Sequence, residues 1–210
     1  MALKCPLCND RKARRLCPAR MEEICTICCG SKREVEIDCP SSCSYLRSGR
    51  EYESARRLQD KTPPAFSSHW EEDFLKKHGP VFAAMYRIIV MVRREYPELI
   101  DGDARAALEA LRKTYETEEK GIFYDFKPNS LLQRKLYDPL KKFLENPAGS
   151  EDANRPRLFT GETISCLDFI LEVVKSFELP RPKSRAFLDS IEEHFGKDLP
   201  ASRNSSLLLP

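Results

Sequence analysis

The sequence predicts a small metal-bound module followed by an all-α helical bundle, and two observations predict this fold class. Eight of the nine cysteines lie between Cys5 and Cys43. From Ser44 onward, apolar residues recur at the three- and four-residue spacing of amphipathic helices. The 210 residues are 41% hydrophobic and 32% charged, a composition typical of folded domains and too polar for a bundle of membrane helices.

The N-terminal residues and the apolar runs of the chain indicate the cellular compartment in which the protein is expected. The N-terminal residues have neither the apolar core of a secretory signal nor the Arg-rich character of a transit peptide. The longest apolar run, 81–92, is shorter than the roughly 20 residues that span a bilayer. We therefore expect a cytoplasmic protein with no membrane partner. Because thiols stay reduced there, we interpret the clustered cysteines as metal ligands, with a disulfide scaffold as the alternative.

The spacing of the cysteines groups them into pairs. Two C-x2-C knuckles begin at Cys5 and at Cys25, and two thiolates at this separation can reach one metal ion. Cys28 and Cys29 are adjacent, and in an extended strand they point to opposite faces, so we assign them to different ions. The last pair has i, i+4 spacing around Pro40, which predicts that both of its sulfurs lie on one face of a starting helix.

These pairs predict two interleaved metal sites. Eight soft thiolates in two closed tetrahedra suit structural Zn2+, although an iron–sulfur cluster is the chemical alternative. Neither site keeps the open coordination position that a catalytic zinc needs. The predicted ligands are Cys5, Cys8, Cys25 and Cys28 for the first zinc ion, and Cys17, Cys29, Cys39 and Cys43 for the second.

The module resembles the cross-braced, treble-clef zinc fingers of the HIT and MYND kinds, which also begin with C-x2-C and end with two ligands near a helix. It departs from them in lacking their late His and in carrying Cys28-Cys29-Gly30. The string Cys-x2-Cys-Cys-Gly-x-Lys-Arg, followed by Cys39-Pro-x2-Cys43-x-Tyr-Leu, is similar to the N-terminus of uncharacterised bacterial proteins with a helical remainder. This resemblance implies a treble-clef-like fold and metal binding, and it implies no activity.

The basic residues of the module allow two interpretations. Residues 1–61 hold 13 basic and 9 acidic side chains. Each all-thiolate zinc site carries a net charge of about −2, so two sites cancel this excess. The arginines from Arg11 to Arg15 therefore serve to neutralise thiolates, and the alternative is that this loop contacts nucleic-acid phosphates.

Composition and end signals divide the chain into four parts. Residues 1–46 form the Cys-rich binuclear zinc module, 47–65 a connecting helix and linker, 66–196 an all-α helical bundle, and 197–210 a disordered tail. Capping residues, glycines and prolines set the expected helix ends. The expected helices run from Ser44 to Asp60, Ser68 to Gly79, Pro80 to Tyr96, Asp101 or Asp103 to Gly121, Asn129 or Ser130 through Leu144, Thr160 to Phe177, and Ser184 to Gly196.

The predicted bundle lacks the sequence patterns of common active sites. It has no Glu-x-x-His pair, Gly-rich phosphate loop, Gly-x-Ser-x-Gly elbow or His-Glu-x-x-His motif. We expect His69, His78 and His194 to lie near helix ends and Cys166 to be a buried core residue. The aromatic segment 121–126 is expected to cap the core, with a partner groove as the alternative.

The resulting functional hypothesis is a non-enzymatic zinc-binding protein that acts as an interaction, scaffolding or regulatory module for a protein partner. One alternative is a nucleic-acid-associated regulator that uses Arg11 to Arg15. A second alternative is an iron–sulfur or redox protein. The sequence identifies no catalytic residue and no pocket for a small molecule.

Overall fold

The computed structural model describes residues 3–59, 70–146, 158–177, 181–197 and 199. They form two units, each with its own core. Unit 1 contains the described residues 3–59 and 181–184, and unit 2 contains 70–146, 158–177, 185–197 and 199. Among these residues, no helix is both long and apolar enough to cross a membrane.

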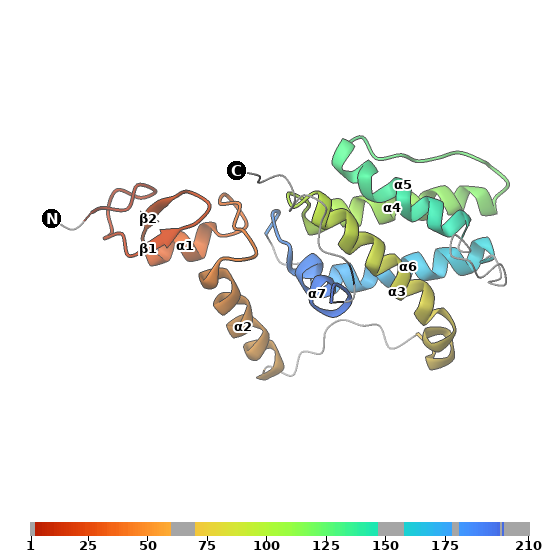
Figure 1. Ribbon diagram of the computed structural model, residues 1–210, viewed down its shortest axis with the longest axis horizontal. Coiled ribbons are helices and arrows are strands. Elements are labelled where there is room, and N and C mark those ends of the chain that lie inside the picture. Colours follow the sequence, from red (N-terminus) through yellow and green to blue (C-terminus); the bar gives the residue numbers. More distant parts are fainter. Residues whose placement is uncertain (1–2, 60–69, 147–157, 178–180, 198, 200–210) are drawn as a thin grey trace, which may run out of the picture. The chain divides into compact units, whose positions relative to one another are not determined.

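Unit 1 combines a short hairpin with two helices (Figure 1). Strands β1 (Arg15–Cys17) and β2 (Glu22–Ile24) pair antiparallel, with Leu16 opposite Glu23. Helix α1 (Thr26–Lys32) follows directly, and α2 (Ser44–Gln59) comes after a turn. The core of this unit is made of Ile24, Ile37, Leu46 and six of the cysteines. The cysteines thus take the place that aliphatic side chains fill in a larger domain.

Two expectations about the helices of unit 1 were wrong. The last cysteine pair does not open a helix: Cys43 N–H donates to the Pro40 carbonyl at 2.9 Å in a turn, and α2 begins one residue later. Cys28 and Cys29 do not lie on a strand, because they belong to α1. The helix was missed because its sequence contains Gly30, two β-branched residues and adjacent cysteines, all poor helix formers.

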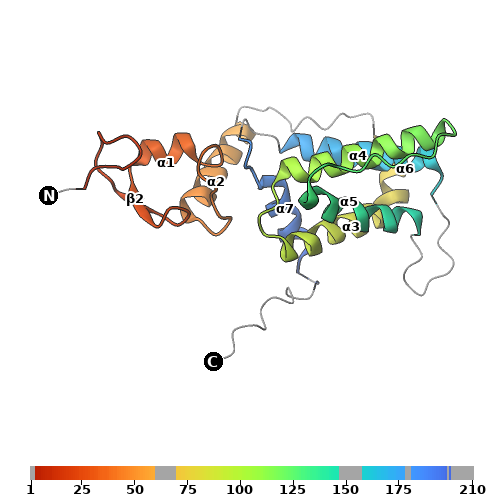
Figure 2. The ribbon, with the colours of Figure 1, turned by 90° about the horizontal axis from the view of Figure 1, so that it is seen from above.

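Unit 2 is built from five helices. Figure 2 shows α4 and α6 side by side in one layer and α3 and α5 in the other, while α7 packs against α3 and α4. The core side chains come from all five helices, as their periodicity predicted. The bounds are α3 (Glu72–Glu95), α4 (Asp101–Glu119), α5 (Leu131–Glu145), α6 (Thr160–Ser176) and α7 (Ala186–Phe195).

The expected break at Gly79 and Pro80 was wrong, since α3 continues through both residues. Phe74 before Pro80 and Phe82 and Met85 after it all pack into the core of unit 2. Their packing offsets the missing hydrogen bond and the ring clash that a proline costs inside a helix. Pro139 is likewise accommodated within α5, so neither proline ends a helix.

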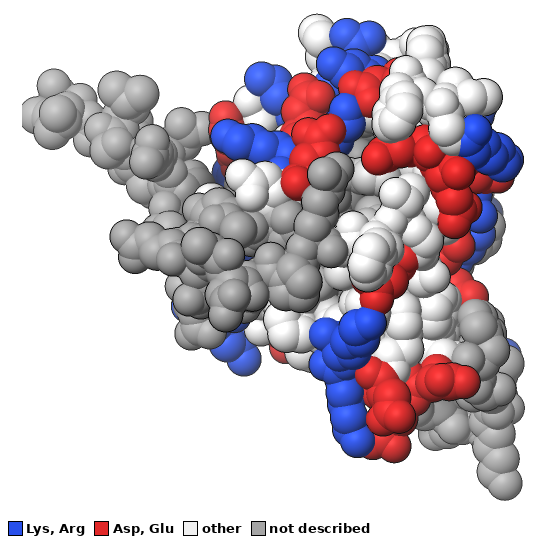
Figure 3. All heavy atoms as spheres, turned by 90° about the vertical axis from the view of Figure 1, so that its right-hand side faces the viewer, with Lys and Arg blue, Asp and Glu red and all other residues white. Residues whose placement is uncertain are grey.

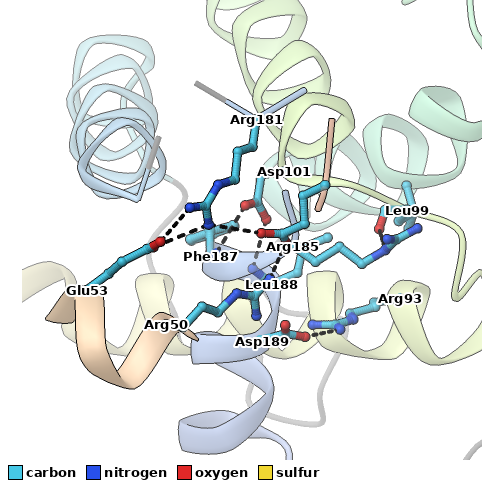
Figure 4. A network of polar contacts seen from close by, with 11 residues as sticks. Arg50, Glu53, Arg93, Leu99, Asp101, Arg181, Arg185, Phe187, Leu188 and Asp189 are labelled. Carbon is cyan, nitrogen blue, oxygen red and sulfur yellow. Dashed lines mark hydrogen bonds and ion pairs between the residues drawn. The ribbon is translucent and has the colours of Figure 1, made fainter. Parts of the chain in front are cut away.

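Two buried charges in unit 2 serve the start of α7 (Figure 4). The Asp101 carboxylate accepts hydrogen bonds from the backbone N–H groups of Phe187 at 3.3 Å and Leu188 at 3.1 Å. It thereby caps a helix to which it does not belong, and it lies where the helix dipole favours a negative charge. The Arg185 guanidinium donates to the Leu99 carbonyl at 3.0 Å. These charged groups therefore have structural roles.

We predict that Leu167→Ala in α6 lowers the free energy of unfolding of unit 2 by about 3 kcal/mol, because it leaves a cavity at a fully buried position between packed helices. Met91→Ala on α3 is the matched control, since 52% of Met91 is exposed, and its effect should stay below about 1 kcal/mol. Urea unfolding followed by far-UV circular dichroism measures both. Equal midpoints for the two variants would contradict the core assignment.

Candidate metal centre

The structure brings together four cysteines of unit 1. The sulfur atoms of Cys5, Cys8, Cys25 and Cys28 all lie within 4.8 Å of one another, and those of Cys8 and Cys25 are 4.0 Å apart. A tetrahedral zinc ion with Zn–S bonds of about 2.3 Å requires its sulfurs about 3.8 Å apart. A disulfide would need about 2.05 Å. The tetrad therefore has the dimensions of a tetrathiolate metal site.

A tight loop positions the first two sulfurs of the tetrad. The Cys5 N–H donates to the Arg11 carbonyl at 2.8 Å, and the Asn9 N–H donates to the Cys5 carbonyl at 2.8 Å. Asn9 has a φ of 51°, a left-handed conformation that asparagine tolerates better than most residues. The backbone therefore turns sharply around Cys8 and holds its sulfur next to that of Cys5.

The start of α1 positions the other two. Cys25 is the N-cap of this helix, and its sulfur accepts a hydrogen bond from the Cys28 N–H at 3.3 Å. A sulfur at this position faces the N–H groups of the first turn. Cys28 lies one turn further along and is 4% exposed. A helix N-terminus and a knuckle thus each supply two sulfurs to one centre.

The surroundings of the tetrad shift the acidities of its thiols in both directions. Backbone N–H groups of Arg11 and Asp10 hydrogen-bond the Cys8 sulfur and lower its pKa to about 6. Burial raises the pKa of Cys28 to about 12, and its contacts with neighbouring thiols act in the same direction. Four clustered sulfurs cannot all carry charge without a cation between them, so the site fits a group that supplies positive charge.

The second predicted set of cysteines surrounds a small cavity. Cys17, Cys29, Cys39 and Cys43 all line an enclosed volume of about 10 Å³. Within the part of the chain that the structure describes, only the first tetrad brings three or more metal-ligand atoms within 4.8 Å of one another. The second set therefore shares one cavity with other side chains, and no three of its sulfur atoms lie within 4.8 Å of one another.

Two arginines of the predicted basic loop lie beside these thiols. Arg15 donates a hydrogen bond to the Cys29 sulfur at 3.6 Å, and its guanidinium lies 4.7 Å from the centre of the Tyr45 ring. Burial alone would lower the pKa of Arg11, but the charges of Cys8 and Asp10 beside it raise that pKa. One arginine thus faces each set of cysteines.

Glu34 is a buried acid that the sequence pattern does not predict. Its side chain is 1% exposed, and it pairs with Arg50 of α2 at 2.5 Å and with Arg181 at 3.5 Å. Arg181 also binds Glu53 of α2. The Glu34 backbone has a φ of 55°, and its carbonyl accepts a hydrogen bond from the Lys183 N–H at 2.8 Å. These contacts attach residues 181–184 to unit 1.

The other chemically notable side chains have structural surroundings. Cys166 is fully buried in α6, as predicted, and burial raises its pKa to about 12. His78 lies inside α3 rather than near a helix end, packs between Phe74 and Phe82, and has its pKa lowered by burial. His194 bonds the Ser190 carbonyl at 2.7 Å, and His69 lies outside the described residues. Of these groups, the described ones, Cys166, His78 and His194, do not join the cysteine sites.

The aromatic segment 121–126 does not cap the core as expected. Ile122, Phe123 and Tyr124 are 57%, 84% and 61% exposed. Phe126 is half-buried, and its ring is covered by the Lys113 ammonium at 4.3 Å. The expectation was wrong because the core of unit 2 is closed by helical side chains, which leaves no apolar gap for this segment to fill.

Comparison with known proteins adds no family to these observations. No family model, curated protein sequence or solved structure matches the chain. The class of site is therefore defined by its own geometry, which is a cluster of four thiols able to bind a metal ion.

We predict that Cys28→Ser lowers the bound metal by at least one equivalent per chain, because it removes one of four sulfurs from the tetrad. Cys166→Ser is the matched control, since Cys166 is buried in unit 2 and should leave the metal content unchanged. Elemental analysis of the purified proteins measures both. Equal metal content in Cys28→Ser and the unmodified protein would refute the assignment.

We predict that Glu34→Gln destabilises unit 1 by about 3 kcal/mol, because two arginines lose the carboxylate that neutralises them in a buried pair. Glu36→Gln is the control, since the Glu36 side chain is 62% exposed and its pair with Lys32 contributes below about 1 kcal/mol. Metal release to a chromogenic chelator during urea titration measures the difference. Coincident release curves would show that the buried pair contributes little.

Proposed function

We propose that this protein is a non-enzymatic binding protein whose N-terminal unit is folded around two structural zinc ions. The observation that carries the proposal is the tetrad of Cys5, Cys8, Cys25 and Cys28, with all four sulfurs within 4.8 Å. Four sulfur ligands and no oxygen or nitrogen ligand favour zinc over harder cations. With all four coordination positions taken, zinc at this site would stabilise the fold without activating water.

The second zinc ion is assigned to Cys17, Cys29, Cys39 and Cys43. This assignment is supported by a cavity of about 10 Å³ that all four residues line, which is close to the volume of one water-sized sphere. The helical placement of Cys28 and Cys29 adds to this, because successive residues on a helix point about 100° apart. One adjacent pair can therefore serve two ions, and the two sites interleave along the chain.

The order of elements in unit 1 supports the proposed treble-clef-like fold. The chain forms a knuckle at Cys5 and Cys8, then the hairpin β1–β2, then α1, whose start carries Cys25 and Cys28. This order is that of the zinc fingers to which the sequence is similar. We keep the resemblance to uncharacterised bacterial proteins with such a module as part of the proposal.

An interaction role follows from the surface of the same unit. Its hairpin and α1 expose large apolar side chains, with Leu16 61%, Met21 83% and Ile27 55% exposed. The core of the unit is formed by buried cysteines with Ile24, Ile37 and Leu46, and these exposed apolar residues lie outside it. Exposed apolar side chains on a rigid support are typical of protein-binding surfaces. We propose a protein partner, reached in the reducing conditions that keep the thiols available for zinc.

The two alternatives from the sequence have less support. In the loop that nucleic-acid binding would use, Arg15 donates to the Cys29 sulfur, whereas Arg11 and Arg14 are exposed, so one of the three arginines is engaged by a cysteine. An iron–sulfur cluster would add inorganic sulfide and visible colour to the same four thiolates. We therefore favour zinc and a protein partner.

The purified protein should be colourless and contain two equivalents of zinc per chain. After replacement of zinc by cadmium, cadmium NMR should show two signals of tetrathiolate type. Cys28→Ser should remove one of them and Cys29→Ser the other, because adjacent residues belong to different sites. A single equivalent of zinc would contradict the second site, and acid-labile sulfide with visible absorption would contradict zinc altogether.

A further inference from the structure

Unit 2 contains a groove that the proposed zinc sites do not use. It lies where α4 and α5 end and α6 begins, and it has a volume of about 780 Å³. Phe123, Tyr124 and Phe159 line it, and Leu144 and Thr163 are buried residues at its wall. Figure 3 shows the end of unit 2 where these helix termini meet, with uncharged side chains bordered by acidic and basic ones.

The wall that carries the aromatic side chains is tied to the helices. The Phe126 N–H donates to the Thr114 hydroxyl at 3.0 Å, and that hydroxyl also contacts the Tyr137 hydroxyl at 3.0 Å. The Asp125 carboxylate accepts hydrogen bonds from Lys141 at 2.6 and 2.5 Å. Because residues 125 and 126 are anchored, the neighbouring aromatic residues are presented on a defined support.

The aromatic side chains of the groove are unusually exposed. Phe123, Tyr124 and Phe159 are 84%, 61% and 79% exposed, although unit 2 has a complete core beneath them. The Tyr124 and Phe126 rings pack edge to face with their centroids 4.8 Å apart, and this contact orients the Tyr124 ring. Three exposed aromatics around one groove present apolar area and negatively polarised ring faces to a ligand.

The charged residues that line the groove determine whether it attracts a cationic or an anionic ligand. Glu118, Asp125 and Glu145 line it, and Lys141 is its one basic residue. Lys141 already pairs with Asp125 and Glu145, while the Glu118 side chain has no ion pair or hydrogen bond within the described residues. The three acids and one lysine of the lining therefore have a net formal charge of −2 beside aromatic faces, and Glu118 is the acid without a partner among the described residues. Such an arrangement attracts a guanidinium or ammonium group and repels phosphate.

The backbone of the aromatic segment offers further hydrogen bonds. The N–H groups of Phe123 and Tyr124 donate to no acceptor among the described residues. An extended peptide lying along this segment could accept from one of these two N–H groups, since neighbouring N–H groups of an extended backbone point to opposite sides, while its side chains enter the groove. A backbone of this kind and an acidic, aromatic groove together fit a peptide better than they fit a compact small molecule.

We propose that this groove binds a peptide segment of a partner protein, in which an Arg or Lys lies next to apolar residues. The basic side chain binds between the aromatic rings and Glu118, and the apolar neighbours cover Phe123 and Phe159. The proposal rests on the interaction role proposed above and names the partner chemistry of unit 2. It requires no metal in the groove itself.

The test uses the full chain and four pools of randomised nine-residue peptides whose central residue is fixed as Arg, Lys, Leu or Glu. Affinity selection with mass spectrometry should retain the Arg and Lys pools about tenfold better than the Glu pool, a ratio that follows from one cation–π contact plus charge attraction. Peptides retained in this way are then synthesised with a fluorescent label, and their binding is measured by anisotropy.

Three variants locate the binding site. Phe123→Ala should weaken binding of the selected peptides about tenfold by removing apolar contact and a ring face. Glu118→Gln should reduce the preference for Arg and Lys over Leu while keeping apolar binding. Met91→Ala, which removes a side chain that is 52% exposed on α3 and does not line the groove, should change nothing.

Several results would overturn the proposal. Retention of no pool, preference for the Glu pool, or unchanged affinity in Phe123→Ala would each do so. Sedimentation that shows a dimer lost in Phe123→Ala would assign the groove to a second copy of the chain instead. Zinc content is measured on the same samples. Failed peptide binding by a protein that holds two zinc equivalents rejects only the groove proposal. Peptide binding by a protein that lacks two zinc equivalents rejects only the zinc sites.

Discussion

The mutual repulsion of clustered sulfur charges is the constraint on which unit 1 depends. The tetrad places four thiols within 4.8 Å at positions that exclude much of the solvent. N–H groups and arginines compensate part of the charge that would develop there, and a metal ion would compensate the remainder. The loop around Cys8 and the start of α1 take the conformations that bring these four sulfurs together.

Unit 2 is stabilised by the burial of apolar side chains rather than by a cluster of sulfur atoms. All five of its helices contribute aliphatic and aromatic side chains to the core. Its few buried charges cap helices or bind backbone carbonyls. Such a core stays intact without any cofactor. The proposed metal would therefore act on the folding of unit 1, whereas unit 2 has an apolar core of its own and carries the acidic aromatic groove.

Much of this could be predicted from local patterns. Cysteine spacing grouped the sulfurs that the structure brings together, and helical periodicity predicted the core faces of unit 2. Predictions from local signals failed where tertiary packing overrides them, as at Pro80 inside α3 and in the glycine-containing α1. The Glu34–Arg181 pair has no sequence signal at all, because its partners are 147 positions apart and charged residues are usually exposed.

The attachment of residues 181–184 to unit 1 has a consequence for how this chain can be rearranged. The residues come from the connection between α6 and α7, far from the rest of their unit in the sequence. A gene segment that ends after α2 therefore encodes an incomplete copy, in which Glu34 and Glu53 lack one of their arginines. Unit 1 is therefore not a simple N-terminal cassette, and recombination that removes residues 181–184 from it leaves the buried Glu34 carboxylate undercompensated.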